Sequence, residues 1–461
     1  MSQKPKKIFV CDACGFESIK WFGKCPGCAN WNTFREVSTE KEPLLESGSE
    51  TGWIAVSQIP TDRCKRISSG YHWVDRILGG GIVPGSVILV GGDPGVGKST
   101  LMTQIALSTG LSFYLSGEES MDQIRMRASR VTSKDPSGMF LFSTSHLEQG
   151  LESILRSTDQ ITSNPWFVII DSIQTMRVHS APGLPGGVVQ LRESVGIATS
   201  FAKKHQIPIF LVAHITKTGQ IAGPKMVEHL VDVVLYFEGE SSTDLRILRS
   251  MKNRFGPTNE IGVFEMRETG LQEVIDPSER FYDSNSVYPG NTIVVALEGT
   301  TPLVVELQSL VTQSPYSVPK RVSKGIDMER LSLMCAVLSK RLNIPVDRND
   351  VYVNLLGGLR IDDPAIELGL AVSIYSSFVD QSLPNLVAFF GEVGLDGKIR
   401  RVANPIKRIR ELERLQFLKV YTPVLSKDQI QSLRETKLEI IQKDHLVDVL
   451  TELMNQEPTR T

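Results

Sequence analysis

The sequence lacks any apolar run near the ~20 residues that a membrane-spanning helix needs, and no hydrophobic stretch follows its basic start, as one would in a signal peptide. It also lacks an excess of charge, because 50 Lys and Arg side chains against 52 Asp and Glu side chains give a net charge of −2. A whole-protein field that attracts nucleic acid is therefore excluded, and any contact with DNA must come from local basic groups. We expect a cytoplasmic protein.

Cysteine is scarce, but four of the 6 cysteines lie close together: Cys11, Cys14, Cys25 and Cys28. Each Cys-x-x-Cys pair can place two thiolates on one side of a tight turn, and four thiolates make a closed tetrahedral zinc site. Two disulfides are the alternative, which a cytoplasmic location disfavours, and a redox motif lacks its usual scaffold in so short a segment. We predict a zinc-binding domain over residues 1–36, a zinc ribbon.

Aromatic and basic residues alternate in this segment. The rings are those of Trp21, Phe22, Trp31 and Phe34, and the cations are Lys20, Lys24 and Arg35. In so small a domain we expect the four rings to form the core. The alternative is that they stack on bases while the cations contact phosphates.

At 461 residues the chain is too long for one hydrophobic core, so two or three domains are expected. Residues 37–54 are polar and acidic, which is typical of a linker. Over residues 55–275 apolar runs alternate with helical stretches, which predicts an α/β domain with a mostly parallel sheet covered on both faces. Residues 280–455 have a distinct mixed α/β pattern, with a helix over 328–342 and a further helix opened by Asp363-Pro364.

The most informative stretch is Gly-Asp-Pro-Gly-Val-Gly-Lys-Ser at 92–99, between an apolar run and a helical stretch. Strand, glycine-rich turn and helix are the context that a P-loop requires. Lys98 would reach the β- and γ-phosphates of ATP, and Ser99 would hold Mg²⁺. A glycine-rich turn that carries a lysine by chance is the alternative. The predicted nucleotide-binding residues are Gly92, Asp93, Pro94, Gly95, Val96, Gly97, Lys98, Ser99 and Thr100.

Later strands end in candidate catalytic groups. One apolar strand ends in Asp171, the expected Walker B carboxylate that holds Mg²⁺. The first strand after the P-loop helix leads to Glu118, our choice of general base, with Glu119 as the near alternative. Another strand ends just before His214, which would sense the γ-phosphate unless it is merely structural.

Lys252 and Arg254 lie between two apolar strands, 245–251 and 261–266, beside a Gly256-Pro257 turn. Two cations on a hairpin tip usually form only a solvated surface. The alternative is that they reach the nucleotide of a neighbouring subunit as an arginine-finger pair.

The chain resembles the bacterial RadA (Sms) family of DNA-repair ATPases, related to RecA and to the replicative helicase DnaB. The resemblance covers almost the whole chain and rests on the four-cysteine segment 11–28, the stretch 78–85 before the P-loop, Lys-Asn-Arg-Phe-Gly at 252–256, and the stretches 350–360 and 391–395. It implies a RecA-like P-loop core that assembles as a hexameric ring, with ATP, Mg²⁺ and Zn²⁺ as cofactors. It also implies ATP-driven movement on single-stranded and branched DNA, and extension of recombination intermediates alongside RecA.

By analogy with RecA-like motors, DNA would meet loops that face the channel of the ring. The candidates are residues 177–192 and 216–225, which carry Arg177, Arg192, Lys217 and Lys225. Ordinary flexible surface loops are the alternative.

The C-terminal domain resembles the proteolytic domain of Lon, a serine–lysine peptidase, which needs a nucleophile activated by a lysine. Ala365 stands where the serine would be, and Lys407 falls near the lysine position. We therefore expect a Lon-protease-like domain that is non-proteolytic and serves assembly and DNA binding. A basic run fits DNA, although a solvated helix face explains part of it equally well: Lys398, Arg400, Arg401, Lys407, Arg408 and Arg410.

Three functions compete for this pattern. A DNA-dependent ATPase motor in recombinational repair accounts for most of the motifs. An ATP-driven serine–lysine peptidase is opposed by Ala365. A nucleotide-switched DNA-binding module without motor action is disfavoured by Glu118, Lys252 and Arg254, which are groups for hydrolysis.

Overall fold

The computed structural model describes residues 7–11, 16–38, 55, 57, 65–131, 136–158, 166–214, 227–239, 244–258, 260–283 and 287–455. The chain divides into two compact units, Met1–Val274 and Ile275–Thr461. Cys14 and the predicted DNA-contact loop 216–225, with Lys217 and Lys225, lie outside the described residues. Within the ranges given above, no helix combines the length and the apolar character that crossing a bilayer requires.

The N-terminal segment contains a three-stranded antiparallel sheet in the order β2-β1-β3. Its strands are β1 (Lys7–Cys11), β2 (Glu17–Ser18) and β3 (Phe34–Ser38). The last strand therefore runs into the beginning of the stretch whose composition is typical of a linker.

The interior of this segment holds two thiols and one ring, those of Cys11, Cys25 and Phe34. Trp21, Phe22 and Trp31 instead expose 53%, 41% and 69% of their surface. The expectation that all four rings form the core is wrong for these three. So short a sheet encloses little volume, and the sulfur atoms already occupy part of it.

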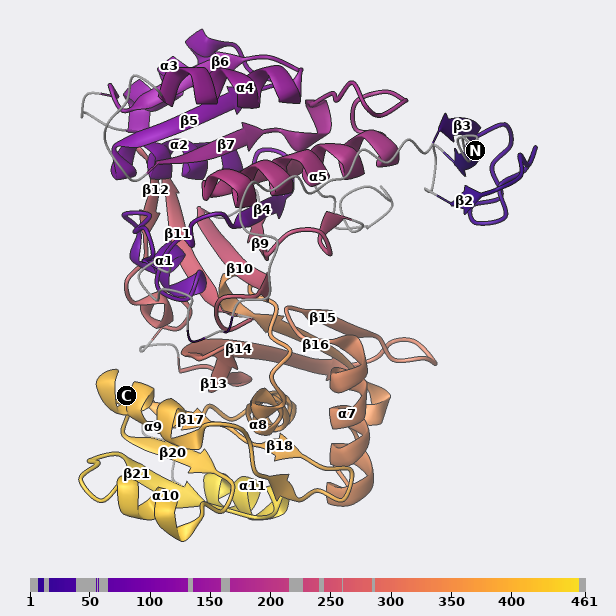
Figure 1. Ribbon diagram of the computed structural model, residues 1–461. Coiled ribbons are helices and arrows are strands. Elements are labelled where there is room, and N and C mark those ends of the chain that lie inside the picture. Colours follow the sequence, from indigo (N-terminus) through magenta and orange to yellow (C-terminus); the bar gives the residue numbers. More distant parts are fainter. Residues whose placement is uncertain are drawn as a thin grey trace. The chain divides into compact units, whose positions relative to one another are not determined.

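The rest of the first unit is built on a nine-stranded sheet in the order β12-β11-β10-β9-β4-β8-β7-β5-β6 (Figure 1). The strands from β9 to β6 are parallel, and β10, β11 and β12 extend the sheet in antiparallel fashion. The strands span Val87–Gly92 (β4), Leu111–Ser116 (β5), Met139–Ser143 (β6), Trp166–Asp171 (β7), Ile209–His214 (β8), Val233–Glu238 (β9), Leu245–Asn253 (β10), Ile261–Arg267 (β11) and Gly270–Glu273 (β12).

Alternate residues of the central strands enter two separate cores. Ile88 and Val90 of β4 belong to one core, together with residues of α1, α2 and α3. Val87 and Leu89 belong to the other, together with residues of α4 and α5. The expected α/β fold with a mostly parallel sheet covered on both faces is therefore confirmed. The helices span His72–Ile77 (α1), Lys98–Thr109 (α2), Met121–Val131 (α3), Leu147–Thr158 (α4) and Val188–His205 (α5), with a 3-10 turn, η3 (Ile173–Thr175), after β7.

The second unit has a seven-stranded mixed sheet in the order β15-β16-β14-β13-β17-β20-β21, and a small hairpin of β18 and β19. Its strands span Asn291–Glu298 (β13), Thr301–Gln313 (β14), Arg321–Lys324 (β15), Asn349–Leu355 (β16), Val387–Phe389 (β17), Glu392–Val393 (β18), Ile399–Arg400 (β19), Lys419–Thr422 (β20) and Glu439–Gln442 (β21). Its α-helices span Met328–Leu342 (α7), Glu367–Val379 (α8), Pro405–Arg414 (α9), Lys427–Ser432 (α10) and Leu446–Met454 (α11).

Two helix starts in this unit follow from their capping residues. The helix predicted over 328–342 is α7, and the Asp327 carboxylate caps it. The Asp363 carboxylate accepts a hydrogen bond from the backbone N–H of Ala365 at 3.0 Å. A 3-10 turn, η7 (Pro364–Ile366), then precedes α8.

Candidate active site

The P-loop lies where β4 turns into α2. Gly97 has a φ of 111°, in the left-handed region that favours glycine, and α2 begins at Lys98. The first amides of a helix have no acceptors within it and are directed toward its N-terminal end, where they can bind an anion. The predicted strand, turn and helix are all present, and their arrangement fits a bound phosphate chain.

The strand register brings the candidate catalytic groups to the same edge of the sheet. Gly92 pairs with His214 across β4 and β8, and Ser116 pairs with Asp171 across β5 and β7. Glu118 lies two residues after the end of β5. Because the carboxyl ends of parallel strands meet at one edge, these side chains share that edge with the P-loop.

The ammonium group of Lys98 is buried in the P-loop, with only 3% of the residue exposed. Nζ donates to the carbonyl oxygens of Gly92 at 2.8 Å and Asp93 at 2.9 Å. Burial lowers the pKa of Lys98, while the carboxylates of Asp171, Asp93 and Glu118 oppose this shift. An anion beside the ammonium favours its charged form, so the site fits a phosphate at this position.

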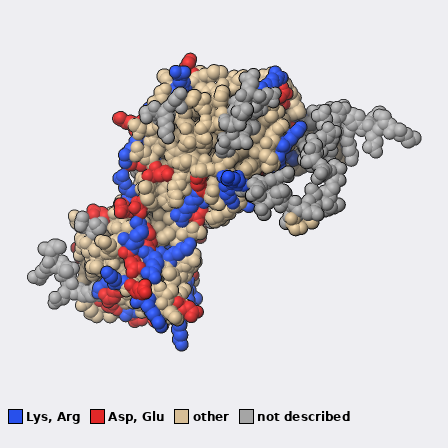
Figure 2. All heavy atoms as spheres, turned by 60° about the vertical axis from the view of Figure 1, so that its left-hand side comes forward, with Lys and Arg blue, Asp and Glu red and all other residues tan. Residues whose placement is uncertain are grey.

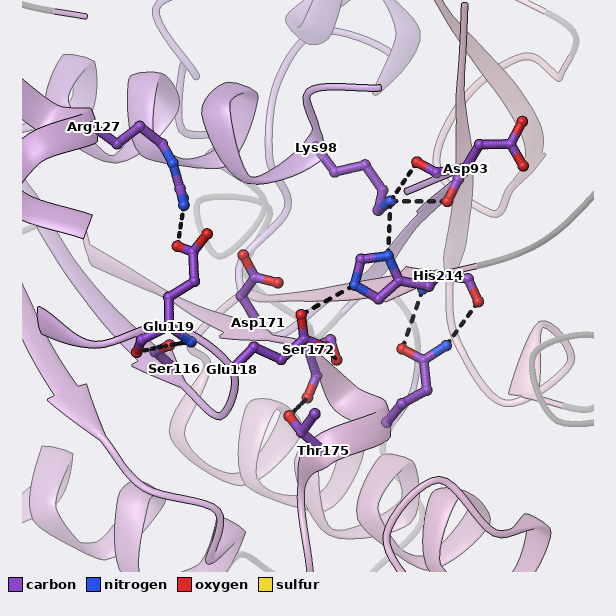
Figure 3. A network of polar contacts seen from close by, with 12 residues as sticks. Asp93, Lys98, Ser116, Glu118, Glu119, Arg127, Asp171, Ser172, Thr175 and His214 are labelled. Atoms are coloured by element: carbon purple, nitrogen blue, oxygen red, sulfur yellow. Dashed lines mark hydrogen bonds and ion pairs between the residues drawn. The ribbon is translucent and has the colours of Figure 1, made fainter. Parts of the chain in front are cut away.

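A chain of polar contacts runs from Lys98 through His214 to Glu118 and Ser172 (Figure 3). Nδ1 of His214 lies 3.3 Å from Nζ of Lys98, and Nε2 lies 3.2 Å from Oε2 of Glu118. Ser172 donates to Oε1 of Glu118 at 2.5 Å. The Glu118 side chain is 36% exposed, so water can reach the carboxylate. The predicted lysine, sensor and base therefore lie together.

Glu119, the alternative base, is directed away from this chain of contacts. Its carboxylate pairs with Arg127 of α3, and its backbone N–H donates to Oγ of Ser116 at 3.0 Å. Figure 3 shows the side chains of Glu118 and Glu119 pointing apart. The geometry therefore favours Glu118.

Asp171 ends β7 and is buried, with 5% of the residue exposed. Its Oδ2 accepts a hydrogen bond from the phenol of Tyr114 at 2.5 Å. Burial, followed by the charge of Asp171, raises the pKa of Tyr114 well above its ordinary value, so the phenol keeps its proton and remains the donor. Oδ1 is then the oxygen that would be available to the predicted Mg²⁺, with Ser99 as the other predicted ligand.

Three of the four predicted zinc ligands converge in the N-terminal segment. The Sγ atoms of Cys11, Cys25 and Cys28 all lie within 4.8 Å of one another, and those of Cys11 and Cys28 are 3.7 Å apart. Tetrahedral zinc with Zn–S bonds of about 2.3 Å separates its sulfur ligands by roughly 3.8 Å. The thiolates therefore fit zinc.

Two family models match parts of the chain, a rubredoxin metal binding domain over residues 9–36 and an AAA domain over residues 58–220. The DNA repair protein RadA of Bacillus subtilis is 42% identical over 437 residues, which cover 92% of this chain and 94% of that protein. The RadA of Halalkalibacterium halodurans is 44% identical, with 91% of this chain and 93% of that protein covered. The RadA of Listeria monocytogenes is 43% identical, with 90% and 91% covered. The chain belongs to the RadA family of DNA repair proteins.

RadA membership agrees with the chemistry of both sites. The metal-binding model and the thiol cluster support Zn²⁺ in the N-terminal segment. The region that matches the AAA domain contains the P-loop, which supports the binding of ATP together with Mg²⁺. The first unit is thus an ATPase domain preceded by a zinc ribbon.

The pentapeptide 252–256, on which the resemblance to RadA partly rests, lies at the opposite end of the sheet from the P-loop. Asn253 of β10 pairs with Val233 of β9, and Val233 pairs with Ile88, near the start of β4. A strand rises about 3.3 Å per residue, so the P-loop, which starts at Gly92, begins roughly 13 Å further along β4. The P-loop of the same chain is therefore out of reach of Arg254.

The sequence predicted that Lys252 lies on a hairpin tip, but the structure places it within β10. β10 continues through Asn253, past a register shift between Ser250 and Lys252. Nζ of Lys252 donates to the carbonyl oxygens of Glu228 at 2.9 Å and Val231 at 2.8 Å. Lys252 thereby holds the turn before β9 and is not a freely projecting cation.

Arg254 follows the strand and is the more accessible of the two cations. Its Nη1 lies 3.1 Å from Oδ1 of Asp232, and its side chain is 53% exposed. The Asp232 side chain of this pair is only 8% exposed, so the ion pair faces solvent on the arginine side alone. The nitrogens of the guanidinium that do not contact Asp232 can therefore bind an anionic ligand.

The first predicted DNA-contact segment is tied to the ATPase domain. The backbone N–H of Arg177 donates to the carbonyl oxygen of Ser145 at 2.7 Å, and Nε2 of Gln190 donates to that of Val178 at 3.1 Å. Arg177 and Arg192 are both exposed. The segment therefore presents exposed cations on a backbone that the domain holds.

Ala365, at the position predicted to correspond to the Lon serine, is completely buried in the core of the second unit. It offers neither a hydroxyl group nor access for a peptide. Lys407 is exposed on α9.

Arg408 is also completely buried, so its predicted place in a DNA-binding run is wrong. Its Nη2 lies 2.7 Å from Oδ2 of Asp363, and its Nη1 donates to the carbonyl oxygen of Val295 at 2.6 Å. This face of α9 packs against β13, which takes the guanidinium out of solvent. Arg400 and Arg410 pair with acidic neighbours, and Figure 2 shows basic and acidic side chains interspersed on the visible face of this unit.

Gln174 belongs to the candidate site, and the sequence analysis missed it. Its Nε2 donates to the carbonyl oxygen of His214 at 2.9 Å, and the N–H of His214 donates to its Oε1 at 3.2 Å. Gln174 therefore holds the His214 backbone at both polar groups. Its place just after Asp171 is the one signal that pointed to it, and Tyr114 carried no signal.

Proposed function

We propose that this chain is a DNA-dependent ATPase that acts in the cytoplasm as a motor of recombinational DNA repair. It would extend branched recombination intermediates, moving on single-stranded DNA alongside RecA. The observation that carries the proposal is the contact chain from Lys98 through His214 to Glu118. It links a phosphate-binding group to a candidate base, as a machine driven by hydrolysis requires.

Hydrolysis assigns a separate task to each residue of the site. Lys98 exchanges its carbonyl partners for the β- and γ-phosphates, and Glu118 accepts the proton of the attacking water. The hydrogen bond from Ser172 fixes one oxygen of Glu118, so the other is directed toward His214. Mg²⁺, which Ser99 and Asp171 would hold, neutralises charge on the phosphates.

His214 would report the state of the γ-phosphate. Its ring contacts Lys98 on one side and Glu118 on the other. When Lys98 turns to a phosphate, the ring loses one partner, so its position depends on the nucleotide. His214 ends β8, and the predicted DNA-contact loop 216–225 follows it in the sequence, so a shift of the ring would be passed to that loop.

A hexameric ring would supply what one chain lacks. Arg254 and the P-loop lie at opposite ends of the sheet, so head-to-tail neighbours can bring the arginine of one subunit to the phosphates of the next. Lys252 would position this arginine by fixing the adjacent turn. An arginine finger stabilises the charge that develops on the transferred phosphoryl group.

DNA would be held mainly through its phosphates, because a motor must move over any sequence. Arg177 and Arg192 of the held segment, with Lys217 and Lys225, are the proposed contacts. The second unit would be a non-proteolytic, Lon-like platform for assembly, since its Ala365 is buried.

ATP turnover of size-fractionated protein, measured with and without single-stranded DNA, tests the proposal together with strand extension on a branched substrate. We expect the wild type to show DNA-stimulated turnover and extension, and Glu118→Gln to bind ATP but to show neither. Glu119→Gln is the matched control and should retain both. A wild type that binds DNA in an ATP-dependent way without turnover would instead be a nucleotide-switched binding module.

A further inference from the structure

Two tryptophans lie next to each other on the surface of the zinc ribbon. Trp21 is 53% exposed and Trp31 is 69% exposed. Both adjoin Gly23, where a Cβ atom would lie 3.7 Å from Cη2 of Trp21 and 3.8 Å from Cζ3 of Trp31. We refer to the rings of Trp21 and Trp31 as the tryptophan pair.

The second cysteine knuckle holds the tryptophan pair in place. The backbone N–H of Asn32 donates to the carbonyl oxygen of Gly23 at 2.8 Å, and that of Cys25 donates to the carbonyl oxygen of Asn30 at 2.8 Å. Lys24 and Trp31 form an antiparallel bridge between these bonds. Since these pairs enclose Cys25 and Cys28, metal binding at the two thiolates would stabilise the backbone that carries the rings.

Two other aromatic residues of the ribbon contact its core, although they are themselves partly exposed. Phe16 and Phe22 both contact the ring of Phe34, with centroids 6.3 Å and 6.0 Å away. The tryptophan pair is therefore additional aromatic surface that the small core does not use. Exposed indoles are costly in water, which points to a ligand that covers them.

A cation accompanies the rings and decides the class of ligand. Nζ of Lys24 lies 5.8 Å from the centroid of the Trp31 ring, and Lys20 is exposed beside Trp21 in the sequence. Protein-binding surfaces are enriched in aromatic residues but depleted in lysine. Aromatic rings with adjacent cations match a nucleotide, whose base stacks and whose phosphate is anionic.

We propose that the tryptophan pair and Lys24 form a binding site for single-stranded nucleic acid. The rings stack on successive bases and Lys24 neutralises a phosphate, so the site accepts any sequence. A duplex is excluded because its bases are already stacked and paired. The choice of DNA rather than RNA rests on the proposed function, whereas the stacking site itself does not.

Fluorescence of the full-length, zinc-loaded chain tests this site. Oligothymidylate should quench the emission of the exposed tryptophans, and the Trp21→Ala, Trp31→Ala double variant should bind it more weakly, by about tenfold for each ring removed. Phe at both positions should restore much of the affinity because an aromatic face is retained. Zinc content, measured on the same samples, should equal that of the wild type.

Three comparisons complete the experiment. Ile19→Ala removes a 73% exposed apolar side chain from the same segment and should leave the affinity unchanged, because isoleucine cannot stack. A blunt duplex of the same length should bind the double variant and the wild type equally. Oligouridylate in place of oligothymidylate shows whether the sugar matters.

The proposal is overturned if the double variant binds oligothymidylate like the wild type, or if Ile19→Ala weakens binding as much. Loss of repair in cells with unchanged affinity for the oligonucleotide would assign the pair to a protein partner, and would overturn it equally. If DNA does not change the ATP turnover of the wild type, the proposed function is contradicted. Weaker oligonucleotide binding by the double variant would establish the stacking site even in that case.

Discussion

Nε2 of His214 lies 3.2 Å from the carboxylate of Glu118. On its other side the same ring lies 3.3 Å from Nζ of Lys98. One imidazole thus connects the group that would bind phosphate to the group that would activate water. The first two predictions follow from this connection.

Glu118→Gln should keep ATP binding and lower kcat by about 10²–10⁴-fold, because glutamine cannot accept the proton of water. Glu119→Gln should retain turnover, since its carboxylate is engaged with Arg127. Equilibrium binding of ATP and steady-state turnover, compared between these isosteric variants, check the assignment. Normal hydrolysis by Glu118→Gln would mean that another group is the base.

Gln174→Ala should release the backbone of His214, which it holds through two hydrogen bonds. Each bond contributes about 0.5–1.5 kcal/mol, so we expect kcat to fall by about tenfold while the KM for ATP changes little. Gln174→Glu keeps the acceptor for the N–H of His214 and loses the donor, so it should give an intermediate value. Equal losses in both variants, with an increase in KM, would indicate a general disturbance of the site.

Arg254→Ala should bind ATP nearly as well as the wild type and hydrolyse it about 10³–10⁵-fold more slowly, as expected for a missing arginine finger. Lys98→Ala should also be inactive, because it lacks the ammonium group that contacts the phosphates of ATP. Mixing the two variants should restore some turnover, because an interface needs an arginine from one subunit and a P-loop from the other. If mixed rings form and remain inactive, Arg254 does not act between subunits.

Arg408→Met should destabilise the second unit by about 3–5 kcal/mol, because it leaves the Asp363 carboxylate without its buried partner. Burial lowers the pKa of Arg408, and the charge of Asp363 opposes this shift. The buried guanidinium therefore keeps its charge with the help of the carboxylate. Hydrogen exchange at the amides of β13, which adjoin the guanidinium at Val295, measures the loss. Combining the variant with Asp363→Asn should cost less than the sum of the single changes.

Purified protein should contain one zinc ion per chain, and Cys25→Ala should lose it. Removing a thiolate opens the site, and a segment this small depends on its metal for folding. Metal analysis checks the zinc content, and near-UV circular dichroism of the exposed tryptophans checks the folding of the segment. Unchanged zinc in Cys25→Ala would refute the ligand set.

Local features of the fold were predictable because they follow from local chemistry. The apolar spacing over 328–342 identified α7, and the glycines before Lys98 identified the turn from β4 to α2. The carboxyl ends of the parallel strands then had to meet, which placed Asp171 and His214 near the P-loop.

Contacts between distant segments were not predictable in this way. Gln174 reaches His214 across 40 positions of sequence, and neither side chain carries a periodic signal. Arg408 has the composition of a surface residue, but its burial depends on Asp363 and β13. The exposure of Trp31 likewise reflects how little volume the ribbon encloses.

The separation of Arg254 from the P-loop along the sheet gives each subunit two unlike ends. A two-fold symmetric dimer joins like surfaces and would leave its P-loops unmatched, whereas a head-to-tail assembly joins unlike ones. If the subunits assemble head to tail as proposed, an open row of n subunits has n P-loops but only n − 1 interfaces, so one P-loop has no arginine beside it. Closing the row into a ring completes that remaining site. Activity per chain would then rise steeply with protein concentration, and a single defective subunit would impair two neighbouring interfaces.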